Sequence, residues 1–224
     1  MNVAPRPPVK LGVLISGEGT NLQTIIDAIA CGDLRAEIRL VISNKASAGG
    51  LERARRHGIS AATIDHRGFA NRRAFDRALV EALQSHEVEL VVCAGFMRLL
   101  SPVMIDAFRG RIMNIHPALC PAFPGVDAVR QALAYGVRFT GCSVFFVAEG
   151  VDDGPLIIQA VVPVFQDDDE AALAARIHAE EHRIYPLAIR LYQEGRLEID
   201  GRIVRIRDHQ PATDLGSLVN PRPD

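Results

Sequence analysis

The chain has 224 residues, of which 48% are hydrophobic, and this supplies one substantial core of the size expected for a single α/β domain. Its formal net charge is −2, so no excess of positive charge would gather a polyanion, and DNA or RNA is disfavoured as the main partner. No apolar run approaches the roughly 18 residues that a membrane span needs, and the proline-rich start lacks the apolar stretch of a signal peptide.

The first half of the chain alternates short apolar runs with helical patterns. Leu11–Ile15 is a mostly apolar run that ends at Ser16-Gly17, and the apolar residues from Leu22 to Ile29 then have helical spacing. Strands alternating with helices imply βαβ units, so we expect a Rossmann-like α/β fold, with a mostly parallel twisted sheet and helices on both faces. The pattern continues with predicted strands at Ile38–Ile42, Ala61–Ile64 and Leu90–Ala94 and predicted helices at Leu51–His57 and Arg72–Ser85.

The second half of the chain is less regular. A predicted strand at Arg111–Ile115 leads into the proline-rich stretch His116–Gly125, which can be neither a helix nor a central strand. We expect residues 1–207 to form a single domain and residues 208–224 to be a loosely ordered C-terminal tail. The other predicted elements are a helix near Val126–Tyr135, strands at Cys142–Val147 and Leu156–Val164 joined by turn residues, and a long helix from after Asp169 to about Gln193.

The cysteines indicate a reducing compartment. Cys31, Cys93, Cys120 and Cys142 are far apart and form no C-x-x-C pair, which argues against a zinc ribbon or a disulfide framework. We therefore expect a cytoplasmic protein. From its charge and the lack of a membrane span, we expect its partners to be small molecules rather than nucleic acids or membranes. We also expect a monomer or a homodimer.

A glycine turn follows the first predicted strand and opens the first predicted helix, at Ser16-Gly17-Glu18-Gly19-Thr20-Asn21. A helix start presents unpaired N–H groups and a positive dipole, so an anion such as phosphate would bind there, and Gly17 and Gly19 let the backbone approach it closely. Taken alone, the turn could also be a tight strand-to-helix connection without a ligand. A dinucleotide site is disfavoured, because Leu22 stands where that motif needs a third glycine.

Three polar residues suggest acyl transfer to an amine. Asn114 and His116 lie two apart at the end of a predicted strand, so their side chains should project from the same side of the carboxyl edge of the sheet. A turn between the late strands could bring Asp152 to the same rim. The asparagine would donate a hydrogen bond to an oxyanion, the histidine would act as acid or base, and the aspartate would hold and charge the imidazole. Asn-x-His alone could equally be a loop-capping pair.

Together, several motifs resemble folate-dependent formyltransferases, and the resemblance covers about Lys10 to Arg205. It rests on the strand end, the proline-rich loop and the late turn. These read Asn114-Ile115-His116-Pro117, Pro121-Ala122-Phe123-Pro124-Gly125 and Gly150-Val151-Asp152-Asp153-Gly154-Pro155, alongside the glycine turn, Ser43-Asn44-Lys45, Ala94-Gly95-Phe96-Met97-Arg98 and Glu181-His182-Arg183-Ile184-Tyr185-Pro186.

The resemblance implies the formyltransferase fold and transfer of the formyl group of 10-formyltetrahydrofolate, the cosubstrate, to the amine of 5-phosphoribosylglycinamide in purine biosynthesis. It also implies a division of roles. The transfer falls to Asn114, His116 and Asp152. The phosphoribosyl substrate would bind to Gly19, Thr20, Asn21 and Glu181. The folate pocket would be lined by Arg72, Met97, Arg98, Leu99, Leu100 and Asn114, with Ala148–Asp152 closing against the pterin.

Some positions depart from the family pattern: Phe145 stands where a histidine is frequent, and Asp153 and His178 also differ. The segment His178-Ala179-Glu180-Glu181-His182 fits the H-x-x-E-H pattern of zinc peptidases, but no third ligand is evident downstream and we expect no metal. Two alternatives stay open. One is a formyltetrahydrofolate hydrolase, which would use water as acceptor and usually carries His-His-Ser where His116 here precedes Pro117. The other is a noncatalytic phosphate-binding module.

Overall fold

The computed structural model describes residues 6–208 of the chain. The tail expected from Asp208 onward lies, apart from Asp208 itself, outside the described residues. The strands are β1 (Val9–Ile15), β2 (Ala36–Ser43), β3 (Ala61–Thr63), β4 (Leu90–Cys93), β5 (Ile112–His116), β6 (Phe139–Phe146), β7 (Leu156–Pro163), β8 (Leu197–Asp200) and β9 (Ile203–Ile206). The helices are α1 (Thr20–Ala30), α2 (Gly49–Arg56), α3 (Arg72–Ser85), α4 (Pro102–Ala107), α5 (Ala128–Tyr135) and α6 (Glu170–Gln193), with a short 3-10 helix at His66–Gly68.

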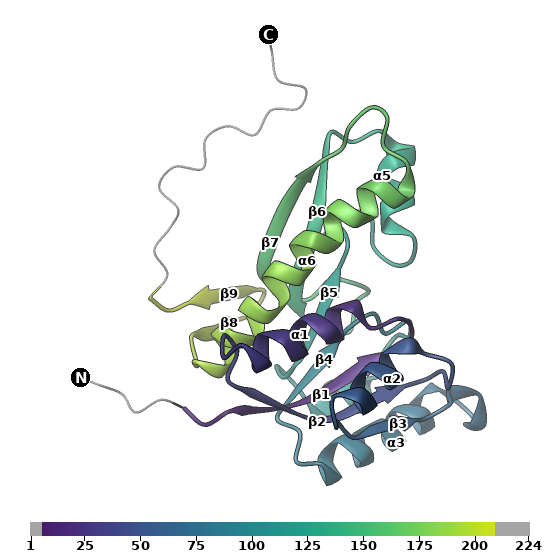
Figure 1. The fold of residues 1–224 in the computed structure, drawn as a ribbon, viewed down its shortest axis with the longest axis vertical. Helices are drawn as coiled ribbons and strands as arrows, with labels where there is room; N and C mark the ends of the chain where they lie inside the picture. Colours follow the sequence, from purple (N-terminus) through teal and green to yellow (C-terminus); the bar gives the residue numbers. More distant parts are fainter. Residues whose placement is uncertain (1–5, 209–224) are drawn as a thin grey trace.

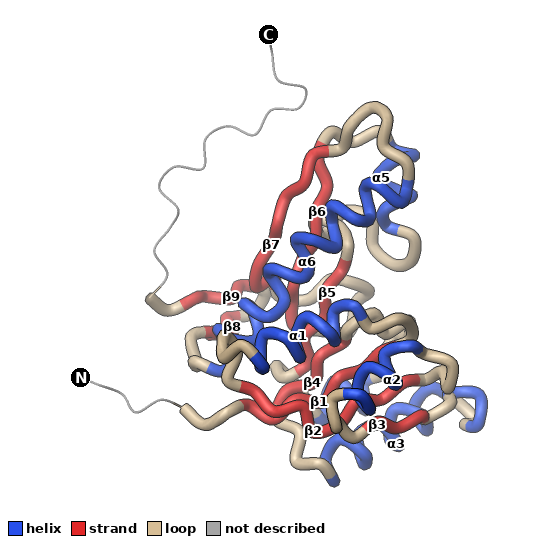
Figure 2. The backbone as a smooth tube through the Cα atoms, viewed as in Figure 1, coloured by secondary structure: helices blue, strands red, loops and turns tan. Residues whose placement is uncertain are grey.

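The described strands form one mixed sheet in the order β3-β2-β1-β4-β5-β6-β7-β9-β8. The strands from β3 to β5 are parallel to their neighbours, whereas β6 is antiparallel to both β5 and β7. Figures 1 and 2 show the long β6–β7 hairpin extending away from the parallel strands, together with α5 and the first half of α6. The predicted Rossmann-like class, with a mostly parallel sheet, is confirmed.

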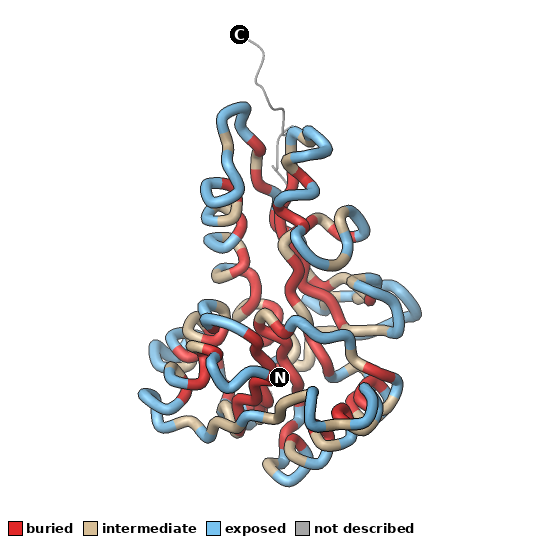
Figure 3. The backbone as a smooth tube through the Cα atoms, turned by 90° about the vertical axis from the view of Figure 1, so that its right-hand side faces the viewer, coloured by how far each residue is buried: buried red, intermediate tan, exposed pale blue. Residues whose placement is uncertain are grey.

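Helices cover both faces of the sheet, as predicted. One core forms beneath α1, α2, α5 and α6, and a second forms beneath α3 and α4. Because side chains alternate along a strand, β1 sends Val13 into the first core and Leu14 into the second. Figure 3 shows the outcome, with the buried residues on the inner backbone and the exposed ones on the outer turns.

Helix α3 shows how the sequence pattern produces this packing. Phe75, Leu79 and Leu83 recur every four residues and are at most 1% exposed, so one stripe of the helix faces the sheet. Each such side chain stabilises the fold by about 1.5–3 kcal/mol through burial. The N-cap residue of the helix is Asn71, whose side chain accepts a hydrogen bond from the backbone N–H of Ala74.

Two parts of the fold were not predicted. The short helix α4 has only six residues and begins with Pro102, so it offers little periodicity to detect. The β8–β9 hairpin joins the edge of the sheet through Leu156 of β7 and Ile203 of β9. Within residues 6–208, no helix combines the length and apolar character needed to cross a lipid bilayer.

Candidate active site

The candidate site lies where the strand order reverses, at the carboxyl ends of β1, β4 and β5. Strand β1 is flanked by β2 on one side and β4 on the other, and in open parallel sheets the connections after such neighbouring strands diverge and leave a crevice. A cavity of about 690 Å³ lies at the carboxyl ends of β4 and β5, and its lining does not include the residues predicted for the phosphoribosyl substrate, Gly19, Thr20, Asn21 and Glu181. Its lining includes all the residues predicted for the folate pocket, namely Arg72, Met97, Arg98, Leu99, Leu100 and Asn114, and also His116 and the segment 147–152.

Asn114, His116 and Asp152 converge at this cavity. The Nδ2 atom of Asn114 lies 3.4 Å from Oδ1 of Asp152, and Nδ1 of His116 lies 3.5 Å from Oδ2 of the same carboxylate. The antiparallel register places the end of β6 beside β5, with Phe145 opposite Asn114, so the connection that follows β6 can fold back over β5. Asp152 itself has a φ of 49°, a left-handed backbone conformation that sharpens this turn.

The imidazole of His116 is held between two acceptors. Its Nε2 lies 2.8 Å from the carbonyl oxygen of Phe123, and because a carbonyl can only accept, this nitrogen must carry hydrogen. The Asp152 carboxylate faces the other nitrogen and also accepts from the backbone N–H of Gly125 at 2.8 Å. The His116 and Asp152 side chains are only 6% and 14% exposed, so bulk water screens this arrangement little. The ring is therefore oriented by one acceptor at each nitrogen.

Sequence reasoning missed these loop contacts. Phe123 and Gly125 act through backbone groups, and their φ angles are 51° and 83°, which fold the proline-rich loop back onto the histidine. For a bulky residue such as Phe123 the left-handed region costs on the order of 1 kcal/mol or more. The Pro124-Gly125 pair was a signal for a turn, but nothing in the sequence identified the partner of that turn.

The glycine turn forms a tight start to α1. Gly19 is the N-cap residue, with a φ of 72°, and a Cβ atom there would lie 2.7 Å from the Cα atom of Gly50 at the start of α2. Any other residue at position 19 would therefore be strained in its backbone and would collide with α2. Gly19 makes no side-chain cap contact, and the first backbone N–H groups of a helix lack intrahelical acceptors, so the start of α1 can offer them to an anion.

Glu181 connects this turn to α6. The Nδ2 atom of Asn21 donates to Oε2 of Glu181 at 3.0 Å, so the asparagine side chain is engaged with the glutamate. Glu181 is 4% exposed, and its burial raises the pKa of the carboxyl group, while Asn21 and the nearby charges of His178 and His116 lower it. The turn, the glutamate and the histidine thus form one electrostatically linked group.

Helix α6 also fixes the strand ends. The hydroxyl of the fully buried Tyr185 lies 2.8 Å from the carbonyl oxygen of Cys93 and 3.1 Å from that of Met113, and it donates its one hydrogen between them. Because Met113 directly precedes Asn114, this contact holds β4 and β5 at the level of the cavity.

The zinc-peptidase pattern on α6 does not gather a metal site. The rings of His178 and His182 stack with centroids 6.4 Å apart. Within residues 6–208 no group of three or more histidine, cysteine, aspartate or glutamate side chains is arranged to hold a metal ion. The four cysteines are unpaired, and burial raises the pKa of Cys120, which lies in the loop after His116 and so is held mainly as a thiol.

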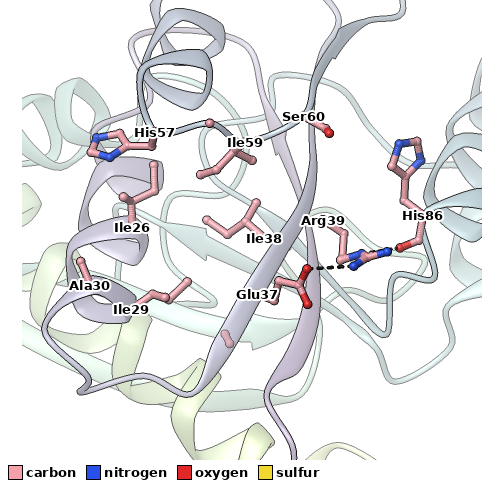
Figure 4. A pocket seen from close by; sticks show the side chains of 12 residues that line it. Ile26, Ile29, Ala30, Glu37, Ile38, Arg39, His57, Ile59, Ser60 and His86 are labelled. Carbon is pink, nitrogen blue, oxygen red and sulfur yellow. Dashed lines mark hydrogen bonds and ion pairs between the residues drawn. The ribbon is translucent and has the colours of Figure 1, made fainter.

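A second cavity, of about 650 Å³, lies at the amino end of β2 (Figure 4). Figure 4 shows apolar side chains such as Ile26, Ile38 and Ile59 there, with the Arg39–Glu37 ion pair at its rim. It is formed by the amino half of β2 and the final turns of α1, whereas ligands of parallel sheets bind at the carboxyl edge. The cavity with the convergent polar groups is therefore the candidate active site.

Known proteins resemble this chain over most of its length. Residues 9–189 match the family described as Formyl transferase. Phosphoribosylglycinamide formyltransferase of Escherichia coli (strain K12) is 48% identical over 187 residues, which cover 84% of this chain and 88% of that protein. The enzyme of the same name from Haemophilus influenzae is 45% identical over 190 residues, covering 85% of this chain and 90% of that one.

The structural comparison agrees. The crystal structure of glycinamide ribonucleotide transformylase 1 from Symbiobacterium toebii superposes with a TM-score of 0.88 and 55% identity, covering 89% of this chain and 94% of that one. Since the family match spans most of the chain and the relatives align over nearly their whole length, the chain belongs to the formyl transferase family.

Proposed function

We propose that this chain transfers the formyl group of 10-formyltetrahydrofolate to the amine of 5-phosphoribosylglycinamide, and that residues 1–207 act as one formyltransferase domain. Membership of the formyl transferase family and the names of the relatives support the reaction and its acceptor. The single observation that carries the proposal is the convergence of an amide, an imidazole and a carboxylate, from Asn114, His116 and Asp152, at the wall of the cavity.

The reaction needs no nucleophilic side chain, because the substrate amine attacks the formyl carbon itself. A C–N bond forms to the incoming amine, the bond from the formyl carbon to N10 of the folate breaks, and one proton moves from the amine to N10. The protein must therefore stabilise an oxyanion and move a proton, and it neither gains nor loses atoms.

Asn114 has two amide hydrogens, and only one of them faces Asp152. The other is available to donate to the formyl oxygen as negative charge develops there. A donor of this kind supplies on the order of 10²–10³-fold in rate when it is fixed in advance, because no reorganisation is needed at the moment of reaction.

His116 supplies a second N–H donor near the same carbon and carries the proton between the amine and N10. The Asp152 carboxylate stabilises the imidazolium and fixes the ring plane, so the proton-bearing nitrogen is aimed rather than free to rotate. In the structure both ring nitrogens face protein acceptors, the Asp152 carboxylate and the Phe123 carbonyl, so the Nε2–H group must exchange the Phe123 carbonyl for the substrate during the reaction.

The substrates occupy the two sides of this group. The backbone N–H groups at Gly19, Thr20 and Asn21 bind the phosphate, and Glu181 accepts from polar groups of the ribosyl substrate. The folate lies in the cavity of about 690 Å³, where Arg72 and Arg98 offer positive charge and Met97, Leu99 and Leu100 offer apolar surface. Both substrates then meet at His116.

The test is a steady-state assay of the purified chain with 10-formyltetrahydrofolate and either phosphoribosylglycinamide or water as acceptor. We expect tetrahydrofolate to be released only with the ribosyl amine and in equal amount to the formylated product. Release at the same rate without the amine would show a hydrolase, and folate binding without release under either condition would show a noncatalytic binder. The variant Asp153→Asn, which alters the exposed neighbour of Asp152, is the matched control and should retain activity.

A further inference from the structure

Asp76 is a buried carboxylate that the proposed mechanism does not use. It lies on α3, four residues after Arg72, and its exposed fraction is 0%. Arg72 reaches the cavity, whereas Asp76 lies beneath it, on the inner side of the helix. A buried carboxylate is costly unless its oxygen atoms accept hydrogen bonds, so the partner that it does have is informative.

The partner is the backbone of the cavity wall. The Oδ2 atom of Asp76 accepts a hydrogen bond from the backbone N–H of Ser101 at 2.5 Å. Ser101 is itself fully buried and is the N-cap residue of α4. It ends the segment 95–101, whose residues from Gly95 to Leu100 line the cavity. Asp76 therefore fixes the far end of this wall.

The wall is also attached at its start and through two side chains: the backbone N–H of Ser16 donates to the carbonyl oxygen of Gly95, and Phe96 and Leu100 pack in the second core. Its start is held by the hydroxyl of Ser16, which accepts from the backbone N–H of Met97 at 2.8 Å, and its Phe96 ring stacks on Phe75 of α3. Between these points, the side chains of Met97 and Leu99 are 62% and 54% exposed and contribute little packing of their own. The position of the exposed part thus depends on the two ends.

The charge of Asp76 also reaches the cavity. Burial raises the pKa of its carboxyl group, and Ser101 together with the positive charges of Arg72 and Arg98 acts in the opposite direction. Both arginines line the cavity from different segments of the chain. The attraction between a buried carboxylate and two cavity arginines favours the arrangement in which the wall lies against α3.

We propose that Asp76 is a positioning residue for the folate side of the site: by accepting the Ser101 N–H it holds the wall 95–101 in the shape that binds the folate. This inference rests on the proposed function, because it names which of the two substrates the wall serves. It places the effect of Asp76 in folate affinity and leaves the phosphoribosyl side, formed by the glycine turn and Glu181, unchanged.

The test compares Asp76→Ala with Asp76→Asn. The alanine removes the acceptor, and we expect the KM for 10-formyltetrahydrofolate and the Kd for tetrahydrofolate, measured by calorimetry, each to rise on the order of 10-fold, as loss of a charged hydrogen-bond partner predicts. The KM for phosphoribosylglycinamide should change less than about 2-fold. The asparagine keeps an oxygen atom where Ser101 needs one, so it should restore most of the folate affinity. Glu81→Ala, which removes an exposed acid from the same helix, is the control and should match the parent chain.

Ser101→Pro provides a second variant should Asp76→Ala fail to fold. It removes the same N–H, and the φ of −90° at Ser101 has the sign that proline requires and lies about 25° from its preferred angle. Unchanged tetrahydrofolate affinity in a folded variant, or equal rises in KM for both substrates, would overturn the positioning role. Failure of the parent chain to bind tetrahydrofolate or to transfer the formyl group would instead overturn the proposed function, so the two failures are distinguishable.

Discussion

Asn21 and Glu181 are 160 positions apart in the chain, and the side-chain amide of the first donates to the carboxylate of the second at 3.0 Å. The contact joins the first turn of α1 to the middle of α6. Glu181 is buried, and this contact holds its carboxylate beside the proposed phosphate turn. A change at Glu181 should therefore affect both substrate binding and the stability of the fold.

Glu181→Gln should stabilise the protein while weakening substrate binding. Burial raises the pKa of Glu181 above 4.5, so its ionisation is opposed in the folded state and stability falls as the pH rises from 4.5 through the folded pKa. Glutamine removes this loss and can still accept from Asn21. Urea unfolding at pH 7 should show a higher free energy of unfolding for the variant, with the difference shrinking toward pH 4.5, and the KM for phosphoribosylglycinamide should rise. Glu180→Gln, at a more exposed neighbour, should change stability by less than about 0.5 kcal/mol. A less stable Glu181→Gln protein would count against this reading.

Inorganic phosphate should compete with phosphoribosylglycinamide and not with the folate. The reason is that the Gly19 turn offers N–H groups and a helix dipole to an anion, whereas the folate occupies the cavity beyond His116. Initial-rate inhibition patterns at varied concentrations of each substrate check this. Competition with 10-formyltetrahydrofolate alone would move the phosphate site away from the glycine turn.

Asn114→Ala should lower kcat by on the order of 10²-fold, with a smaller change in either KM, because the amide acts only on the charge that develops during the reaction. Steady-state kinetics with both substrates varied measure this directly. A large rise in KM with kcat unchanged would make Asn114 a binding residue.

The Asp168–Arg176 ion pair should stabilise the chain above acidic pH. The two side chains form paired contacts of 2.8 and 2.9 Å, and Arg176 also lies over the ring of Phe165. The hydrogen bond from Arg176 lowers the pKa of Asp168 from its ordinary value of 3.8, so the stabilisation is present above pH 3.8 and is lost as the pH falls through the lower, folded value.

Asp168→Asn should therefore lower the free energy of unfolding at pH 7 by about 1 kcal/mol, and by progressively less below pH 3.8. Urea unfolding across this range measures the effect, and Asp106→Asn, in an exposed pair with Arg109, is the control. An Asp168→Asn effect that grows as the pH falls would have the wrong sign.

Much of the fold could be predicted from the sequence because periodicity reports burial. The expected helix at Arg72–Ser85 has the bounds that the structure gives α3, since its apolar residues recur at helical spacing over four turns. The β8–β9 hairpin was missed because its strands are short and largely exposed, with Ile199 42% and Ile203 57% exposed, so they lack a buried face. Short elements that join an existing sheet edge take their stability from the partner strand, which local sequence does not reveal.

Only the part of the site that depends on side-chain chemistry could be predicted from the sequence. The spacing of Asn114 and His116 on one strand, together with the family motifs, led to the group that Asp152 completes. The contacts made by the backbone of Phe123 and Gly125, and the anchoring of Ser101 by Asp76, were invisible because they depend on how separate segments meet. Backbone groups are nearly the same at every position, so residue type does not indicate which of them will make such contacts.

The most direct test of the account is a double-mutant cycle on His116 and Asp152, measured as kcat for formyl transfer to phosphoribosylglycinamide. If the carboxylate acts through the imidazole, His116→Asn and Asp152→Asn each lower kcat by roughly 10²-fold or more, and the double variant is no slower than the slower single variant. Turnover near that of the parent chain in either single variant, or losses that multiply in the double variant, would contradict the account.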